Sequence, residues 1–509
     1  MRDHVPLKIT EFNGFWKRGD VESTPNDHFS DAQNIKYIES GFMTRDGLDV
    51  HLVSVGGCLN LLNIVRAYTY LRPDRQSLLV LDTDGNIYDT TGPTPCIPIL
   101  TIVGMTDFSF AAWAGRAYIT PHNGELGLQN EFVYVYLGYG ASARKAAGAG
   151  PASTPAMTLA LNFPGNISTG VHVFGVVFET DTGFLTSIGA FTQYNSIGVN
   201  KVDISVIPIS ADSFVKKRHI VATKAIDPLV FTGNLEEYEF FFIPNAVIND
   251  NTTTTLSAVN FYDSELIESA SYLLDALSEI PAGVFINIYH NRLVVGGFYG
   301  AANSDPLLDT SENISTARVS TAGEPEAFDD VDGIIIAPID GNPLTNGQEY
   351  RDLLYLFKLT RTYAYVDNDD VPSTWALSTI DQGIGCPPHG IATVLDSGGI
   401  NIEYLIICDY SGVILFNGTY ARPELSWKIQ DYWLALDRDE FDRIQILNDT
   451  IGQLLYIVLP DWTMLYADCA DGLNPKDIKW CPWVFPVRAN TIAFINTNTL
   501  IIGSSGLMP

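Results

Sequence analysis

The sequence has no apolar run near the length of about 18 residues that a membrane-spanning helix needs. Helical periodicity is almost as scarce: the best stretch is 266–277, and Pro281 stops its continuation. Positive charge is also in short supply, with 29 Lys and Arg against 59 Asp and Glu, a formal net charge of −30. Wrapping DNA or lying on an anionic membrane needs a positive surface. We therefore expect neither a membrane span nor a basic nucleic-acid-binding module.

Cysteine is sparse and scattered, and no two cysteines form a CxxC pair. The six are Cys58, Cys96, Cys386, Cys408, Cys469 and Cys481. The first residues lack the apolar core of a secretory signal. We therefore expect a protein made in a cytoplasm, with buried, reduced thiols.

Motifs that would indicate catalysis are missing. There is no HExxH, no GxSxG and no Walker loop, and the eight histidines never fall at paired metal-ligand spacing. Asp82-x-Asp84-x-Asn86 has the first three ligand positions of a calcium loop, but Ile87 follows where glycine is needed. We expect an ordinary hairpin turn there, and whether it binds an ion stays open. No enzyme activity, metal or cofactor is expected.

Strands and turns are what the sequence does contain. Hydrophobic residues make up 46% of the 509 residues, with 42 Gly, 24 Tyr and 26 Phe, a composition that favours β-structure. Apolar strands joined by polar turns predict antiparallel hairpins. The predicted hairpins cover 78–88, 285–297, 404–418 and 454–466.

These hairpins share one pattern: an apolar strand, a polar turn, and a strand that ends near an aromatic residue. The pattern is typical of diverged β-propeller blades, which cannot bury both faces alone and must stack around an axis. A large sandwich assembly would show similar hairpins and stays an alternative. The favoured fold class is all-β.

The middle of the chain differs. After a linker of small residues at 138–150, strands are expected at 157–161, 170–179, 202–207, 217–223 and 237–243. Regular strands over about 100 residues predict a small β-sandwich. We therefore expect a β-propeller in two parts, 1–150 and 261–509, with an inserted immunoglobulin- or fibronectin-III-like β-sandwich domain at 151–260.

Several segments carry a family resemblance by their order. An apolar–glycine patch at 12–16, a DAQN segment at 31–34 and a glycine-bounded turn at 41–47 come first. Segments 290–294, 320–328, 353–358, 362–366, 383–387 and 410–418 follow. Together they resemble tail nozzle proteins of short-tailed bacteriophages, of the tail tubular protein B or packaged-DNA stabilisation type. The resemblance covers most of 1–150 and 280–500.

The middle segment resembles fibronectin-III-like insertions of phage tail proteins. The residues that carry this likeness are Val173, Phe174, Glu179, Thr180, Gly183 and Arg218-His219-Ile220.

The resemblance implies a virion structural protein of the tail. Such proteins form a hexameric ring that docks on the tail adaptor protein below the portal, near tail fibres or spikes, and lets phage genomic DNA pass without sequence-specific binding. An acidic wall repels phosphates, so DNA would slide along it. The candidate channel-lining residues are Asp329, Asp330, Asp332, Asp367, Asp369 and Asp370. Residues 151–255 are the candidate adaptor-docking surface, and whether the negative charge lies in the lumen or outside stays open.

Three alternatives remain. A tail fibre or receptor-binding module would need a stalk of heptads or fibrous repeats, which is not visible. A propeller-type polysaccharide hydrolase would need two carboxylates at a separation that sequence does not reveal. A cellular ligand-binding propeller would be expected to show a signal peptide or recognisable equal repeats.

Overall fold

The computed structural model describes residues 33–38, 41–44, 63–72, 74–91, 96–138, 140–152, 156–274, 279–300, 310–329, 333–368, 371–381, 383–396, 402–418, 425–495 and 499–507. The chain divides into two compact units. The propeller unit comprises 1–144, 281–319 and 333–509, and the sandwich unit comprises 145–280 and 320–332. The sandwich unit thus runs 20 residues past the expected boundary at 260 and takes in a second segment, 320–332.

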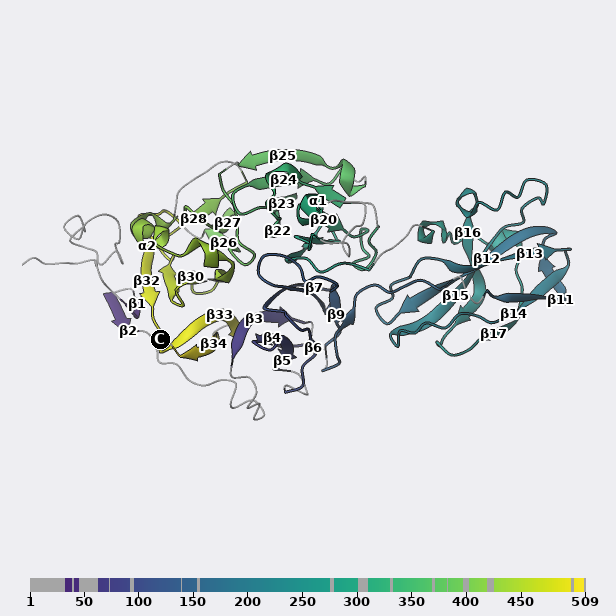
Figure 1. Cartoon of the computed structure of the whole chain (residues 1–509), viewed down its shortest axis with the longest axis horizontal. Coiled ribbons are helices and arrows are strands. Elements are labelled where there is room, and N and C mark those ends of the chain that lie inside the picture. The colour runs from purple at the N-terminus through teal and green to yellow at the C-terminus, as the bar shows by residue number, and fades with distance from the viewer. Residues whose placement is uncertain are drawn as a thin grey trace, which may run out of the picture. The chain divides into compact units, whose positions relative to one another are not determined.

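Among the described residues from 63 onward, the propeller unit contains seven antiparallel sheets that succeed one another along the chain (Figure 1). They are β3 (Ile64–Leu71), β4 (Gln76–Asp82), β5 (Asn86–Asp89) and β6 (Leu100–Thr101); β7 (Asp107–Trp113), β8 (Arg116–His122), β9 (Tyr134–Tyr136) and β10 (Arg144–Lys145); β18 (Phe285–Tyr289), β19 (Arg292–Gly296), β20 (Thr316–Val319) and β21 (Gly333–Ile335); β22 (Asn346–Tyr350), β23 (Leu353–Phe357), β24 (Thr362–Val366) and β25 (Ala376–Asp381); β26 (Ile391–Asp396), β27 (Ile402–Asp409) and β28 (Gly412–Phe416); β29 (Gln445–Asp449), β30 (Leu454–Val458), β31 (Met464–Asp468) and β32 (Lys479–Trp483); and β33 (Val487–Ile495) with β34 (Thr499–Leu507).

Shorter elements complete the unit. The pair β1 (Ile35–Ile38) and β2 (Gly41–Thr44) lies against β32, where the Trp483 indole donates to the Ile35 carbonyl at 2.7 Å. The helices are α1 (Thr310–Ile314), α2 (Gln430–Leu434) and the 3-10 turns η5 (Pro338–Asp340), η6 (Pro372–Thr374), η7 (Leu425–Ile429) and η8 (Arg438–Arg443). The turn η7 packs on β28, whose sheet has three strands.

Hydrophobic cores lie between successive sheets rather than inside any one of them. The β3–β6 and β7–β10 sheets share one core, and five more fill further boundaries around the ring. The last of these joins β33 and β34 to β3 and β4 through Ile501, Ala493, Ile64 and Val80. A set of sheets that closes on itself in this way is a β-propeller, and the expected fold class is confirmed.

The second strand of a blade shows why the sequence folds this way. In β4, Leu79 and Leu81 face the β7–β10 sheet while Leu78 and Val80 face β33 and β34. Side chains alternate between faces along a strand, so a strand with neighbours on both sides needs an unbroken apolar run. The same division occurs in β23, β27 and β30.

The four predicted hairpins are confirmed as β4–β5, β18–β19, β27–β28 and β30–β31. In the first turn, the Asp82 carboxylate accepts from the Asp84 and Asn86 amides at 2.9 and 2.8 Å and from the Tyr88 hydroxyl at 3.2 Å. Gly85 has φ +78, and a Cβ there would lie 2.2 Å from the Ile102 carbonyl oxygen. The Asp82 carboxylate thus serves as the hydrogen-bonding centre of the turn.

The sandwich unit consists of two sheets with a shared core. One sheet has the order β11 (Thr158–Ile167), β14 (Asn200–Ser205), β17 (Thr255–Val259). The other has the order β13 (Gly189–Ser196), β12 (Gly170–Thr180), β15 (Val215–Thr223), β16 (Phe240–Ile248). Three 3-10 turns, η2 (Leu235–Glu237), η3 (Asp263–Glu265) and η4 (Ser271–Leu273), follow β15. That this sandwich is of the fibronectin-III type stays a prediction.

Two expectations are wrong. The candidate helix at 266–277 is a single 3-10 turn, η4, in its described part. Instead of helical bonds, the Glu268 carbonyl accepts from the Phe242 amide and the Ala270 amide donates to the Phe240 carbonyl, both at the edge of β16. Cys96 is disulfide-bonded, whereas Cys386, Cys408, Cys469 and Cys481 are buried thiols outside any disulfide, as expected. Cys58 lies outside the described residues. Among the described helices, none has the length and apolarity to cross a bilayer.

Candidate functional site

The first strands of the seven sheets converge on a cavity of about 320 Å³, called here the axial cavity. Each of these strands, or the residue just before it, contributes to the lining. The polar lining residues include Tyr68, Ser109, Asn287, Gln348, His389 and Gln445. The described lining contains no Asp or Glu.

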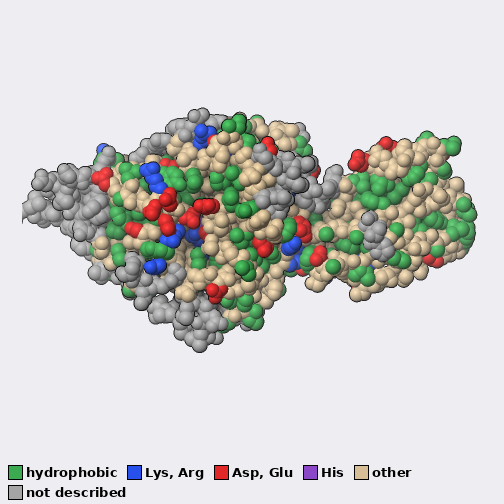
Figure 2. All heavy atoms as spheres, viewed as in Figure 1, with side chains coloured by type: hydrophobic (Ala, Val, Ile, Leu, Met, Phe, Trp, Pro, Cys, Tyr) green, Lys and Arg blue, Asp and Glu red, His purple; other side chains and the backbone are tan. Residues whose placement is uncertain are grey.

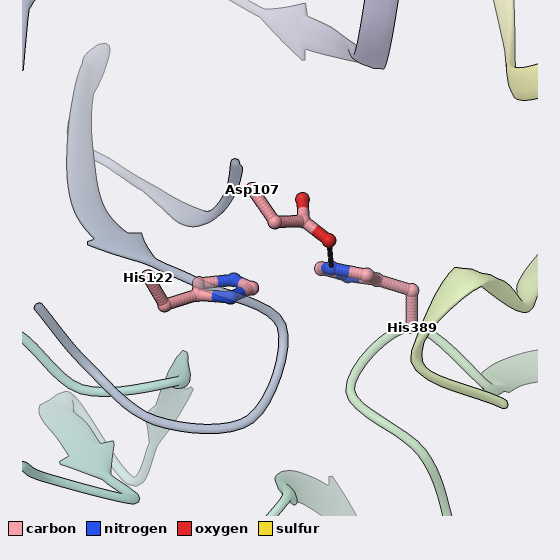
Figure 3. A group of neighbouring side chains, drawn as sticks. All are labelled: Asp107, His122 and His389. Atoms are coloured by element: carbon pink, nitrogen blue, oxygen red, sulfur yellow. Dashed lines mark hydrogen bonds and ion pairs between the residues drawn. The ribbon is translucent and has the colours of Figure 1, made fainter. Parts of the chain in front are cut away.

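A group of polar residues, the axial cluster, lies beside this cavity: Arg66 and the half-buried Tyr68 on β3, Asp107 on β7, His122 at the end of β8, and His389 just before β26. Arg66 and Asp107 are 3% and 4% exposed, and His122 is 0% exposed. Figure 3 shows the His389 ring bonded to Asp107 and lying beside the His122 ring, whose centroid is 5.6 Å away. The cluster therefore joins three sheets that are far apart in sequence.

The Asp107 carboxylate has every acceptor position filled. Its Oδ1 accepts from Arg66 Nε at 2.8 Å and from the Phe108 amide at 2.7 Å. Its Oδ2 accepts from Arg66 Nη2 at 2.5 Å and from His389 Nε2 at 3.0 Å. A carboxylate offers about four lone-pair sites, so these donors saturate it.

The hydrogen bonds also assign the tautomers of both histidines. The Gly124 amide donates to His122 Nδ1 at 3.1 Å, so the proton of a neutral ring is on Nε2, 3.2 Å from Ser109 Oγ. Ser109 in turn donates to the Val284 carbonyl at 2.9 Å. In His389, Nε2 donates to Asp107 and Nδ1 accepts from the Tyr68 hydroxyl at 2.5 Å. Both rings are satisfied in the neutral form.

The pKa values follow from this burial. Burial lowers the pKa of His122 to about 3. Burial also lowers the pKa of His389, although the Asp107 carboxylate partly opposes it. Burial alone would raise the pKa of Asp107, but attraction to Arg66 outweighs it and holds that pKa well below its usual range. At neutral pH the cluster is therefore one ion pair flanked by two uncharged imidazoles.

Asp107, His122 and His389 are close enough to one another to be considered as metal ligands. Their hydrogen bonds argue against it. Metal coordination needs an imidazole lone pair, and the one on His122 already accepts from Gly124. The Arg66 guanidinium, paired in two places with Asp107, would also repel a cation. The group fits a structural cross-link rather than a metal site.

The acidic residues predicted to line a channel do not lie together in the described structure. Asp330, Asp332, Asp369 and Asp370 lie outside the described residues. Asp329 is half-buried and belongs to the sandwich unit. Asp367 belongs to the propeller unit, where its side chain is 5% exposed and lies 3.4 Å from Arg292 Nε and 3.8 Å from His290 Nδ1. A carboxylate buried against a guanidinium adds little repulsive charge to a wall. That Asp367 lines a channel stays a prediction.

Sequence reasoning missed the axial cluster. His389 lies 282 residues from Asp107 and 321 residues from Tyr68. Each histidine alone looks like an isolated polar residue in an apolar strand or turn. What the residues share is a position at or near a strand end close to the propeller axis. Recognising this from sequence requires knowing first how the strands of each blade are aligned.

On the face of the propeller unit seen in Figure 2, acidic and basic side chains lie close to one another instead of forming an unbroken acidic field. Part of the acidic surplus is used within turns, where Asp82, Asp409, Asp449 and Asp461 accept from nearby backbone amides.

No family model matches the chain, and no curated protein matches it. Solved structures similar to it include Hsv2 of Kluyveromyces lactis, with 10% identity over 88% of this chain and 99% of that one and a TM-score of 0.26. Apo AztD of Citrobacter koseri has 12% identity over 65% and 89%, with a TM-score of 0.24. The WD40 domain of SCAP from fission yeast has 8% identity over 87% and 94%, with a TM-score of 0.28. Scores this low carry no functional argument.

Proposed function

We propose that this chain is a virion structural protein: the subunit of a tail nozzle ring that closes and extends the DNA-ejection channel of a short-tailed bacteriophage. The observation that carries the proposal is the agreement between two divisions of the chain. The segments that resemble nozzle proteins cover most of 1–150 and 280–500, and the propeller unit comprises 1–144, 281–319 and 333–509. The exception is 320–328, which belongs to the sandwich unit. The fibronectin-III-like likeness falls on 173–220, inside the sandwich unit.

The axial cluster limits where DNA could pass. Arg66, Asp107 and His389 are buried beside a cavity of about 320 Å³, and a DNA duplex, whose major groove alone is about 12 Å wide, does not fit in such a space. A channel for DNA therefore has to lie between copies of the chain and not through one propeller. This supports a ring, for which we propose six copies, bound to the tail adaptor and neighbouring fibres or spikes.

A structural role fits the axial cavity better than hydrolysis does. Glycoside hydrolases of the common type use two carboxyl groups about 5–9.5 Å apart. Among the described residues that line the axial cavity there is no carboxylate, and Asp107 beside it is saturated by donors. We therefore propose no enzymatic activity.

Two measurements test the proposal. Native mass spectrometry of the purified 55.9 kDa chain is expected to show a hexamer. Gold-labelled antibody raised against the sandwich unit is expected to mark the distal tip of the tail in virions of the phage that encodes the chain. A stable monomer, or gold on the fibres or absent from virions, would reject the nozzle.

A further inference from the structure

The sandwich unit has a groove of about 570 Å³ on the outer side of the β13–β12–β15–β16 sheet. Called here the sandwich groove, it is lined by residues of β12, β15 and β16, by Gly183 and Leu185, and by the segment 265–268. Leu185, Phe242 and Ile267 provide apolar lining, and Glu265 and Glu268 are on one side. Figure 2 shows apolar side chains gathered at several places on the visible face of this unit.

The apolar lining is the uncovered end of a longer apolar layer. One face of this sheet packs into the core shared by the two sheets. On the opposite face, Val177, Val221 and Phe240 are buried beneath Ala270 and Leu273. Leu185 and Phe242 continue that layer but are only partly buried. Ile267, in the covering segment, is 82% exposed. Beyond the part of the sheet that Ala270 and Leu273 cover, the groove therefore exposes apolar side chains to water.

The charge around the groove has one sign on its 265–268 side. The described lining of the groove contains Glu179, Glu265 and Glu268 and no Lys or Arg. Glu265 and Glu268 are both exposed. On the other side, Glu179 is paired with Lys217 and His219, each at 2.7 Å. The negative field at the groove thus comes from 265 and 268 rather than from 179.

We propose that the sandwich groove binds an extended segment of a partner protein in which Lys or Arg alternates with apolar residues. In a strand-like segment alternate side chains point to opposite sides. Its apolar side chains would pack on Phe242, Leu185 and Ile267, while its cations would face Glu265 and Glu268. The same negative charge disfavours DNA and anionic lipid as occupants. The inference does not depend on the nozzle proposal, because it concerns one unit of one chain.

The test measures fluorescence anisotropy of a labelled peptide of alternating lysine and leucine with the full chain. Glu268→Lys is expected to weaken binding about tenfold, because it reverses a charge at the contact. Ile267→Ser is expected to weaken it about fivefold by removing apolar area. Both side chains lie at the surface, Ile267 being 82% exposed and Glu268 exposed, so neither change removes a buried contact.

Matched variants in the same unit separate the groove from the overall charge. Glu239→Lys makes the same charge change at another exposed glutamate, and Leu229→Ser removes a leucine that is 92% exposed. Both are expected to bind the probe as the unmodified chain does. Equal losses in matched variants would overturn the proposal, as would equal binding of a peptide of alternating lysine and serine. Native mass spectrometry of the same variants reports ring assembly separately.

Discussion

Arg66 and Asp107 form a two-point ion pair at the propeller axis, with Nε–Oδ1 and Nη2–Oδ2 distances of 2.8 and 2.5 Å. They come from β3 and β7, the first strands of two neighbouring sheets. Buried charges remain in a protein interior at acceptable cost when they are paired and hydrogen-bonded. The stability of the contact between these two sheets therefore depends on the presence of both residues.

Removing one member of this pair is expected to destabilise the propeller unit strongly. Asp107→Asn or Arg66→Met leaves one uncompensated buried charge or donor set, which costs about 3–5 kcal/mol. Urea unfolding followed by tryptophan fluorescence measures this cleanly, because all eight tryptophans fall in the propeller unit.

Two further variants calibrate that result. The double variant Arg66→Met, Asp107→Leu is expected to lose less than the sum of the single losses, since no charge is left unpaired. Glu440→Gln breaks the ion pair between Arg443 and Glu440, whose side chains are 36% and 40% exposed. The free energy of unfolding is therefore expected to fall by less than about 1 kcal/mol. Additive losses in the double variant would contradict a coupled pair.

The neutral histidines predict that stability falls as the solution is acidified. The pKa of folded His122 is about 3, below the value of about 6.5 for an unfolded histidine. Between pH 6.5 and pH 3 the unfolded chain binds a proton at this histidine that the folded chain does not bind. The contribution of the neutral histidine to stability is therefore complete above pH 6.5 and is lost as the pH falls toward 3. The pKa of His389 is lowered in the same direction.

The corresponding measurement compares urea unfolding of the unmodified chain and of His122→Gln at pH 7, 6 and 5. A histidine whose pKa is lowered on folding changes the free energy of unfolding by up to about 1.4 kcal/mol per pH unit. Glutamine does not titrate, so His122→Gln removes this pH dependence. A smaller pH slope is expected in His122→Gln and again in His389→Gln. If both slopes equal that of the unmodified chain, the neutral assignment of the axial cluster is wrong.

Local sequence patterns were sufficient to predict the hairpins but not the axial cluster. Turns such as 82–86 contain their own Asp and Gly, so β4 and β5 were predictable from neighbouring residues. The axial cluster depends on contacts between strands hundreds of residues apart. The segment 266–277 has helical spacing, but in its described part, 266–274, bonds to the edge of β16 determine the conformation. Tertiary contacts outweighed local propensity there.

Metal ions are expected to leave the propeller unit unchanged. Because the His122 lone pair and the Asp107 oxygens are already occupied, Zn²⁺ or Mn²⁺ would have to displace Gly124 and Arg66 contacts to bind. Melting temperatures with EDTA, with Zn²⁺ and with Mn²⁺ should agree. A rise with one metal that is abolished in His389→Gln would contradict the hydrogen-bond argument and support a metal centre.

The turn at Asp82 offers a test in which two neighbouring aspartates behave differently. Asp82 is 4% exposed, and its carboxylate accepts from Asp84, Asn86 and Tyr88. Asp82→Ala leaves these donors without an acceptor and is expected to cost about 3 kcal/mol. Asp84 is exposed, so Asp84→Ala is expected to change stability by less than about 0.5 kcal/mol.

Calcium separates the structural role of this turn from ion binding. An ion bound between Asp82, Asp84 and Asn86 would make both carboxylates matter and would raise the melting temperature when calcium is added. A carboxylate engaged by the chain's own donors predicts no response to calcium, and a loss confined to Asp82→Ala. Equal losses in the two alanine variants, together with stabilisation by calcium, would show that the turn is a cation site whose ligands include Asp84.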